Sequence, residues 1–157
     1  MSVLLRRRFL IGVLSLGTFL VASGWSTPSD AASQPRRSSG FVAVGTDWET
    51  PYYRIETDKP GPTVMILGGM HGNEPAGAYA AEQIRHWTIR RGTLVVLPCA
   101  NRLGRAANIR YVPDRPMEER DLNRNFPRPT TKTTRGVLAG EIWKLTLAVK
   151  PDWVLDL

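Results

Sequence analysis

The chain has 157 residues, of which 42% are hydrophobic and 22% charged, a balance that excludes a disordered or fibrous protein. Its net charge of +7 is accompanied by no nucleic-acid-binding motif, so we expect no nucleic-acid partner; a positive surface would instead attract anionic substrates or cell-wall polymers. The single cysteine, Cys99, excludes an intramolecular disulfide and is expected to be a small buried residue.

Residues 1–31 have the features of an export signal. Residues 6–8 are all arginine, and residues 9–22 form an apolar stretch that is too short to span a bilayer comfortably. Small residues at 29–31 offer a cleavage site, so the mature chain would begin near Ala32 and keep no stable membrane span. The arginine pair is similar to a twin-arginine signal; an ordinary secretory signal and an uncleaved anchor are the alternatives. The sequence predicts export to the periplasm or the exterior.

Residues 32–50 are expected to hold a linker and a first strand. The linker is expected at residues 34–40, whose composition is Gln-Pro-Arg-Arg-Ser-Ser-Gly. Short strands are expected at residues 41–44 and 52–55, and a turn at residues 59–62. Residues 63–67 are expected to form a strand that is buried on both faces.

A helix is predicted over residues 75–90, with Pro75 in its first turn and Gly92 after its end. Its apolar face is expected to hold Ala76, Ala80, Ile84 and Trp87. Residues 93–97 then form a second apolar run. Because strand, helix and strand follow one another with short connections, we expect a parallel pair of strands joined by a right-handed crossover.

Residues 101–129 have no sustained periodicity and are expected to form a long functional loop. A second helix is predicted over residues 136–149, with one apolar face formed by Leu138, Ile142, Leu145 and Val149. Residues 153–157 begin another strand. A buried strand is an unusual place for a domain to finish. We therefore expect the N-terminal part of a longer α/β domain, whose mixed, largely parallel sheet is flanked by helices and is not completed within this chain.

The stretch from Gly68 to Glu74 directly follows the buried strand of residues 63–67 and carries the first chemically informative pair. Zinc favours imidazole nitrogen and carboxylate oxygen, and His71 and Glu74 supply one of each. Their spacing lets both side chains face one point where the backbone turns into a helix, and Gly72 permits a close turn. The alternative is a loop in which Asn73 or Glu74 only caps the following helix.

Two motifs resemble the signatures of the succinylglutamate desuccinylase/aspartoacylase family, within the zinc carboxypeptidase superfamily. They are Gly-x-His-Gly-Asn-Glu at residues 69–74 and Asp-Leu-Asn-Arg at residues 121–124. The resemblance covers residues 51–157. It implies a zinc carboxypeptidase-like α/β fold with one catalytic zinc ion per complete domain, and an enzyme that removes an acyl group from an amino acid or a terminal residue from a peptide.

The resemblance also implies roles for individual residues. His71 and Glu74 would ligate the zinc ion, and Asn123 and Arg124 would hold a carboxylate of the substrate. A guanidinium group grips a carboxylate through two parallel hydrogen bonds, and an amide adds a directed one. The alternative for Asn123 and Arg124 is a solvated loop.

Arg110 resembles the family arginine that polarises the scissile carbonyl and stabilises the developing oxyanion. Three other arginines close by in the sequence compete for this assignment: Arg102, Arg105 and Arg115. Asp121 is expected to support the loop or to orient a zinc ligand through a hydrogen bond.

Two parts of the family site are expected beyond this chain. The family's third zinc ligand is a histidine that follows a strand ending in Asp-Leu, and the sequence ends at Asp156 and Leu157. We expect histidine as the next encoded residue and a general-base glutamate further on, so that this fragment itself is inactive. His86, the other histidine, is expected to be a partly exposed helix residue and not a substitute ligand.

The alternative function is a secreted, non-catalytic module that binds peptides or the cell wall. A dinucleotide site is excluded because Gly68, Gly69 and Gly72 do not have the G-x-G-x-x-G spacing, and a serine hydrolase because no G-x-S-x-G motif is present. The expected partner is a small molecule or peptide with a free carboxylate. Export favours peptides or cell-wall fragments over the N-acyl amino acids of cytoplasmic catabolism.

Overall fold

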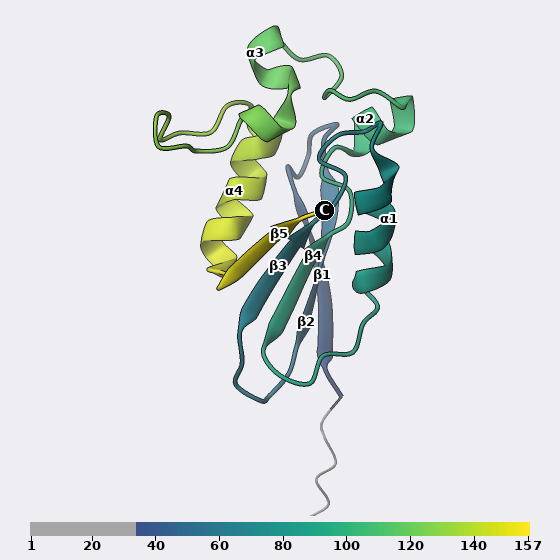
Figure 1. Cartoon of the computed structure of the whole chain (residues 1–157), viewed down its shortest axis with the longest axis vertical. Coiled ribbons are helices and arrows are strands. Elements are labelled where there is room, and N and C mark those ends of the chain that lie inside the picture. Colours follow the sequence, from purple (N-terminus) through teal and green to yellow (C-terminus); the bar gives the residue numbers. More distant parts are fainter. Residues whose placement is uncertain (1–33) are drawn as a thin grey trace, which may run out of the picture. The chain divides into compact units, whose positions relative to one another are not determined.

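The computed structural model describes residues 34–157 (Figure 1). The export signal predicted in residues 1–31, and the expected start of the mature chain near Ala32, lie outside the described residues. Within the described part of the chain, no helix is long and apolar enough to cross a membrane. Export stays a prediction from the sequence.

Five strands form one mixed sheet in the order β1-β2-β4-β3-β5 (Figure 1). Their bounds are β1 Arg36–Val42, β2 Thr50–Glu56, β3 Thr63–Leu67, β4 Thr93–Leu97 and β5 Trp153–Asp156. Strands β4, β3 and β5 run parallel to one another, whereas β2 is antiparallel to both β1 and β4. The predicted parallel pair is therefore β3 and β4, and helix α1 (Pro75–Ile84) connects them.

The central strands β3 and β4 are covered on both faces, as their continuous apolar sequences predict. Alternate residues of a strand point to opposite faces of the sheet. Met65 belongs to one buried cluster together with Ile142 of helix α4 (Val137–Val149), and Ile66 belongs to the other together with Ala81 of α1. Helices α1 and α4 accordingly lie on opposite sides of the sheet (Figure 1).

Helix α4 buries the face that its periodicity predicts. Leu138 and Ile142 are fully buried, and Leu145 and Val149 pack against the same cluster. Strand β5 follows at the edge of the sheet, where all of its residues are exposed, Trp153 among them. An apolar edge strand of this kind is typical of a surface that packs against further protein.

The prediction of a linker at residues 34–40 is wrong for most of that segment. Strand β1 begins at Arg36, and its backbone pairs with β2 in a register that places Arg36 opposite Glu56. Most of β1 is exposed because it lies at the other edge of the sheet, so its polar composition gives no sign of a strand. The guanidinium of Arg37 also donates to three main-chain carbonyls at the end of α1, those of Arg85, His86 and Trp87.

The predicted helix after β3 is shorter than expected, and the face that it buries agrees with the predicted one only at Ile84. It ends at Ile84 instead of Arg90. Its buried residues are Ala78 and Ala81, and Ile84 packs against the same cluster as Ala81, as predicted. Ala76 and Ala80 are exposed, and Trp87 is 58% exposed.

The reason for this change of face is a close approach of the helix to the turn after β3. A Cβ atom on Gly68 would lie 2.6 Å from the carbonyl oxygen of Gly77 and 2.8 Å from the Cβ of Ala81. At that distance only glycine and alanine fit between helix and sheet, so size selects the inward face and hydrophobicity does not.

Residues 101–129, expected to be a loop, contain three short helices. These are α2 (Arg102–Ala107), α3 (Met117–Arg120) and the 3-10 helix η1 (Leu122–Arg124). Each is too short to show a helical repeat in the sequence. The ends of α2 are set by local chemistry: the Asn101 side chain accepts from the N–H of Gly104 at the start, and Asn108 takes a left-handed conformation, φ 54°, at the end.

Cys99 lies two residues after the end of β4 and is partly buried. Burial raises the pKa of its thiol above the ordinary value, although the guanidinium groups of Arg105 and Arg102 act in the opposite direction. A raised pKa leaves less thiolate at a given pH, and the thiolate is the reactive form. We expect iodoacetamide to alkylate Cys99 at pH 8 more slowly than it alkylates N-acetylcysteine, and the rate to rise as the pH approaches the raised pKa. Mass spectrometry of timed samples measures this; equal rates at pH 8 would contradict it.

Candidate metal and substrate site

The turn between β3 and α1 is held against the turn that follows β4. The N–H of Gly68 donates to the carbonyl of Leu97 at 2.9 Å, and the N–H groups of Ala100 and Asn101 donate to the carbonyls of Gly68 and Gly69 at 2.8 and 2.9 Å. Both turns leave the carboxyl ends of parallel strands, the edge at which open α/β sheets bind their ligands. Residues 68–74 therefore lie where a site is expected.

Gly72 is required by a close contact between this turn and helix α2. A Cβ atom at position 72 would overlap the backbone of Gly104 and Arg105. The main chain of Gly72 donates to the carbonyl of Arg110 at 3.4 Å. Helix α2 and the segment that follows it are thus packed directly on the turn that carries His71.

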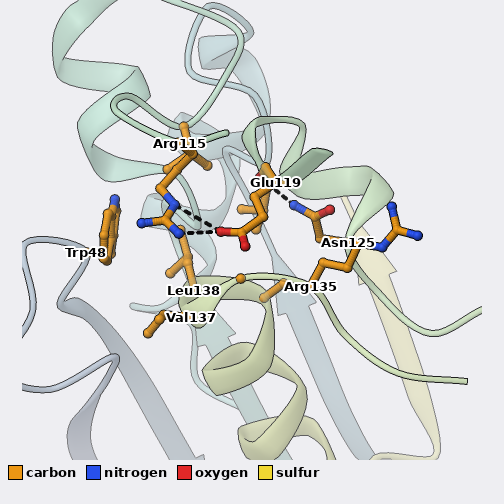
Figure 2. A pocket seen from close by; sticks show the side chains of 11 residues that line it. Trp48, Arg115, Glu119, Asn125, Arg135, Val137 and Leu138 are labelled. Carbon is orange, nitrogen blue, oxygen red and sulfur yellow. Dashed lines mark hydrogen bonds and ion pairs between the residues drawn. The ribbon is translucent and has the colours of Figure 1, made fainter. Parts of the chain in front are cut away.

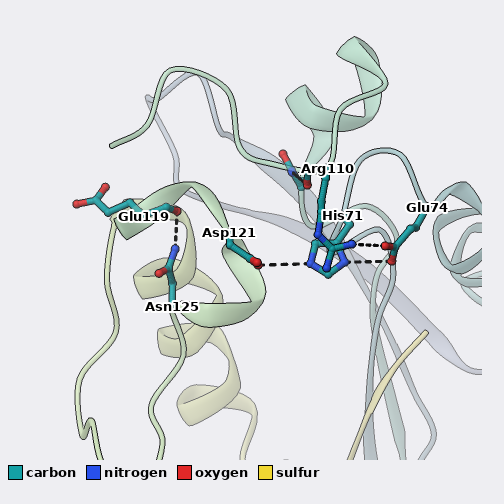
Figure 3. Close-up of polar contacts among 7 residues, drawn as sticks. His71, Glu74, Arg110, Glu119, Asp121 and Asn125 are labelled. Carbon is teal, nitrogen blue, oxygen red and sulfur yellow. Dashed lines mark hydrogen bonds and ion pairs between the residues drawn. The ribbon is translucent and has the colours of Figure 1, made fainter. Parts of the chain in front are cut away.

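The side chains of His71 and Glu74 converge, as the spacing of the motif predicts (Figure 3). Nδ1 of His71 lies 3.0 Å from Oε2 of Glu74. The imidazole is buried, with 7% of His71 exposed, while the side chain of Glu74 is 58% exposed. Glu74 occupies the N-cap position of α1, but its side chain makes no capping hydrogen bond. A role for Glu74 as a helix cap alone would require that hydrogen bond, which the side chain does not make.

The other ring nitrogen of His71 faces the second motif. Nε2 lies 3.4 Å from Oδ1 of Asp121, so the imidazole stands between two carboxylates (Figure 3). A carboxylate on the far nitrogen is the usual partner of a metal-binding histidine, because it fixes the tautomer and the orientation of the ring. Asp121 has the geometry for this orienting contact.

The pair His71 and Glu74 fits zinc in chemistry and in spacing. Zinc bonds to imidazole nitrogen and carboxylate oxygen are each about 2.0–2.2 Å long, so donors 3.0 Å apart can reach one ion. The hydrogen bond from His71, helped by the positive charge of Arg110, lowers the pKa of Glu74 against the raising effect of desolvation. The carboxyl group is therefore ionised at neutral pH, as a metal ligand must be.

Residues 34–157 contain no cluster of three side chains able to hold a metal ion together. Asp121 does not complete the pair because it faces the opposite nitrogen of His71. His86 does not complete it either: its side chain is 62% exposed and lies 3.9 Å from Glu82. The exposure predicted for His86 is confirmed, but its predicted place in a helix is wrong, because α1 ends at Ile84.

Arg110 is the one of the four candidate arginines whose guanidinium contacts Glu74 (Figure 3). The other three are engaged elsewhere. Arg102 donates to the carbonyls of Asp47 and Glu49, Arg105 donates to the hydroxyl of Tyr79, and Arg115 pairs with Glu119 and stacks on the ring of Trp48. The geometry thus favours Arg110 as the arginine that acts beside the two candidate metal ligands, His71 and Glu74.

Asn123 and Arg124 are presented to solvent by a turn that is anchored on both sides. Leu122 and Asn125 are each 2% exposed, whereas Asn123 and Arg124 are exposed. The side-chain amide of Asn125 donates to the main-chain carbonyl of Glu119 (Figure 2). The main-chain carbonyl of Asn125 accepts from the N–H of Arg135. Among the described residues, the side chains of Asn123 and Arg124 have no hydrogen-bond or ion-pair partner. They are available to bind a carboxylate.

A cavity of about 250 Å³ joins this turn to the ends of β3 and β5. Its wall is largely apolar, and Asn123 and Asp156 supply polar groups. Partial desolvation raises the pKa of Asp156, the imidazole of His71 acts to lower it, and the carboxylate of Glu74 acts to raise it. Asp156 therefore lies close enough to His71 and Glu74 to interact with both electrostatically.

In the sequence, Asp156 was identified only as part of the Asp-Leu ending of the strand that is expected to precede the third zinc ligand. The signal that could have identified it is its place at the carboxyl end of a strand parallel to β3, since Asp156 stands opposite Leu67 in the register. That neighbour relation becomes visible only once the strand order is known.

Comparison with known proteins gives a consistent result. The profile described as "Succinylglutamate desuccinylase/Aspartoacylase catalytic domain" matches residues 60–157. A crystal structure of an aspartoacylase family protein from Mesorhizobium loti is 30% identical with a TM-score of 0.61, and the match covers 80% of this chain and 41% of that one.

Two further crystal structures are each 25% identical to the chain. One is a succinylglutamate desuccinylase/aspartoacylase from Rhodobacter sphaeroides, with a TM-score of 0.59 over 78% of this chain and 39% of that one. The other is a succinylglutamate desuccinylase from Silicibacter, with a TM-score of 0.58 over 80% and 40%. No curated protein sequence gave a significant match.

The chain spans about two fifths of the length of these solved structures. The profile match covers more than half of the chain and includes both motifs, and the fold agrees with the structural neighbours. The chain belongs to the succinylglutamate desuccinylase/aspartoacylase family, whose named activities are hydrolytic.

Proposed function

We propose that the full-length protein is a zinc-dependent hydrolase of an amide or peptide bond, and that residues 34–157 supply two zinc ligands and the side chains that hold the substrate. The observation that carries this proposal is the 3.0 Å approach of His71 Nδ1 to Glu74 Oε2, with Arg110 on the same carboxylate. Family membership supports hydrolysis in general. The donor pair supports the metal.

The zinc ion would be held by His71 and Glu74, and when bound it supplies a water of lowered pKa and polarises a carbonyl oxygen. With the metal on Nδ1 of His71, the ring proton would sit on Nε2 and be donated to Oδ1 of Asp121, 3.4 Å away. Asn123 and Arg124 grip a carboxylate of the substrate and fix its orientation, which lowers the entropic part of the barrier. Arg110 stabilises the negative charge that develops on the carbonyl oxygen.

The third zinc ligand and the general base are proposed to come from the part of the full-length protein that this chain does not include. For the substrate we propose a peptide or cell-wall fragment with a free carboxylate, because the N-terminal segment predicts export. A non-catalytic binding module on the same fold is the alternative.

Hydrolysis by purified full-length protein tests the proposal. Peptides and N-acyl amino acids with a free carboxylate are incubated with the protein, before and after treatment with 1,10-phenanthroline, and released amine is measured. We expect chelation to lower the rate on the order of 10³-fold, because the metal lowers the activation barrier by several kcal/mol. Added Zn²⁺ should restore the rate. Hydrolysis that is insensitive to chelation would contradict the zinc mechanism. Bound zinc without hydrolysis of any substrate would favour the binding module.

A further inference from the structure

Asn101 is a buried amide where three segments of the site meet: the turn that carries His71 and Glu74, the start of α2, and the segment that carries Arg110. It follows β4 and is 1% exposed. Its N–H donates to the carbonyl of Gly69 at 2.9 Å, its Oδ1 accepts from the N–H of Gly104 at 2.9 Å, and its Nδ2 donates to the carbonyl of Arg110 at 3.4 Å. One side chain thus links the start of α2 to the main chain of Arg110, while its backbone is fixed to the turn that carries His71.

The carbonyl of Arg110 is held by two donors, Nδ2 of Asn101 and the N–H of Gly72. Both distances are 3.4 Å, which is long for a hydrogen bond, so neither donor alone fixes the carbonyl tightly. The chain reaches Arg110 from α2 through Asn108, which is left-handed, and Ile109, whose N–H donates to the carbonyl of Gly104. The path of this segment therefore depends on contacts around Asn101.

The arrangement requires a side chain that both accepts and donates. An amide offers both functions in one planar group, whereas an ionised carboxylate offers only acceptors. An aspartate at position 101 would keep the cap on Gly104 but would place a carboxylate oxygen against the carbonyl of Arg110. A serine would keep a capping oxygen in a smaller side chain that does not replace the amide.

We propose that Asn101 is a positioning residue for Arg110: its Nδ2 holds the Arg110 main chain where the guanidinium reaches Glu74 and the reacting carbonyl. This inference rests on the proposed function, in which Arg110 stabilises the oxyanion. The competing explanation is that Asn101 only caps α2, in which case any capping residue would serve equally well.

A double-mutant cycle in the full-length protein separates the two explanations. Asn101→Asp and Asn101→Ser, which both keep a capping oxygen, are each combined with Arg110→Ala, and kcat and KM are measured for the substrate hydrolysed by the unaltered protein. We expect each Asn101 variant to lower kcat about tenfold and to change KM much less, since Arg110 acts in the transition state. In the Arg110→Ala background we expect the same substitutions to cost less than about twofold, because the group being positioned is absent. Bound zinc per protein should stay at the value of the unaltered protein.

An equal loss in both backgrounds, or no loss in either, would overturn the inference, since Asn101 would then act independently of Arg110. A crystal structure of the Asn101→Ser variant tests the geometry without reference to activity. We expect the Arg110 guanidinium to have left Glu74, and an unchanged contact would also overturn the inference. If the unaltered protein hydrolyses no substrate, the proposed function fails, and the crystal structure still decides whether Asn101 positions Arg110.

Discussion

Replacing His71 by alanine in the full-length protein is expected to remove bound zinc and to lower kcat on the order of 10³-fold or more. His71 supplies the nitrogen donor of the pair and also carries the contact to Asp121. Its loss leaves Glu74 as the remaining metal donor of the pair. Zinc content by elemental analysis and kcat with the substrate of the unaltered protein measure the two effects.

His86 provides the matched control for this prediction. It is the other histidine of the chain, and its side chain is 62% exposed. Its Nε2 lies 3.9 Å from Oε1 of Glu82, in α1. We expect His86→Ala to keep zinc and activity close to those of the unaltered protein. Stoichiometric zinc in the His71→Ala variant would contradict the assignment of this residue as a ligand.

Replacing Gly72 by alanine is expected to destabilise the protein by about 3 kcal/mol or more and to disrupt zinc binding. The added methyl group would overlap the backbone of Gly104 and Arg105, and rigid backbone cannot turn aside as a flexible side chain can. Helix α2 must then move away from the turn that carries His71 and Glu74. Urea unfolding and zinc content measure the two consequences.

Gly140, inside helix α4, is the control for the Gly72 substitution. The nearest atom to a Cβ atom at this position is Oγ1 of Thr134 at 3.6 Å, an ordinary contact. Alanine is the better helix former by about 0.5–1 kcal/mol, so we expect Gly140→Ala to be neutral or stabilising. If Gly72→Ala unfolded at the same urea concentration as the unaltered protein and kept its zinc, the close packing of α2 on the turn would be wrong.

The elements that could be predicted from the sequence are those whose burial leaves a regular pattern. Strands β3 and β4 are apolar throughout because both faces are covered, and α4 repeats its apolar residues at helical spacing. Strand β1 could be predicted only at its last two residues, 41 and 42, because the exposed remainder of an edge strand needs no apolar residues. The buried face of α1 was predicted correctly at Ile84 but not at Ala78 and Ala81, because the close approach at Gly68 selects for small side chains rather than apolar ones.

The site could be predicted as far as its geometry is local. His71 and Glu74 are three residues apart, so a turn into a helix brings them together without help from the rest of the chain. Arg110 was chosen among neighbouring arginines through the family resemblance alone, because the sequence does not show which of them meets Glu74 in space. Asn101 and Asp156 were missed for the same reason: their partners are defined by which turns and strands are adjacent.

The most direct test of the zinc site is a crystal structure of the full-length protein, with diffraction data collected on both sides of the zinc absorption edge. We predict an anomalous peak about 2.0–2.2 Å from Nδ1 of His71 and from a carboxylate oxygen of Glu74. A peak at other residues, or side chains of His71 and Glu74 that point apart in a protein that hydrolyses its substrate, would contradict the account.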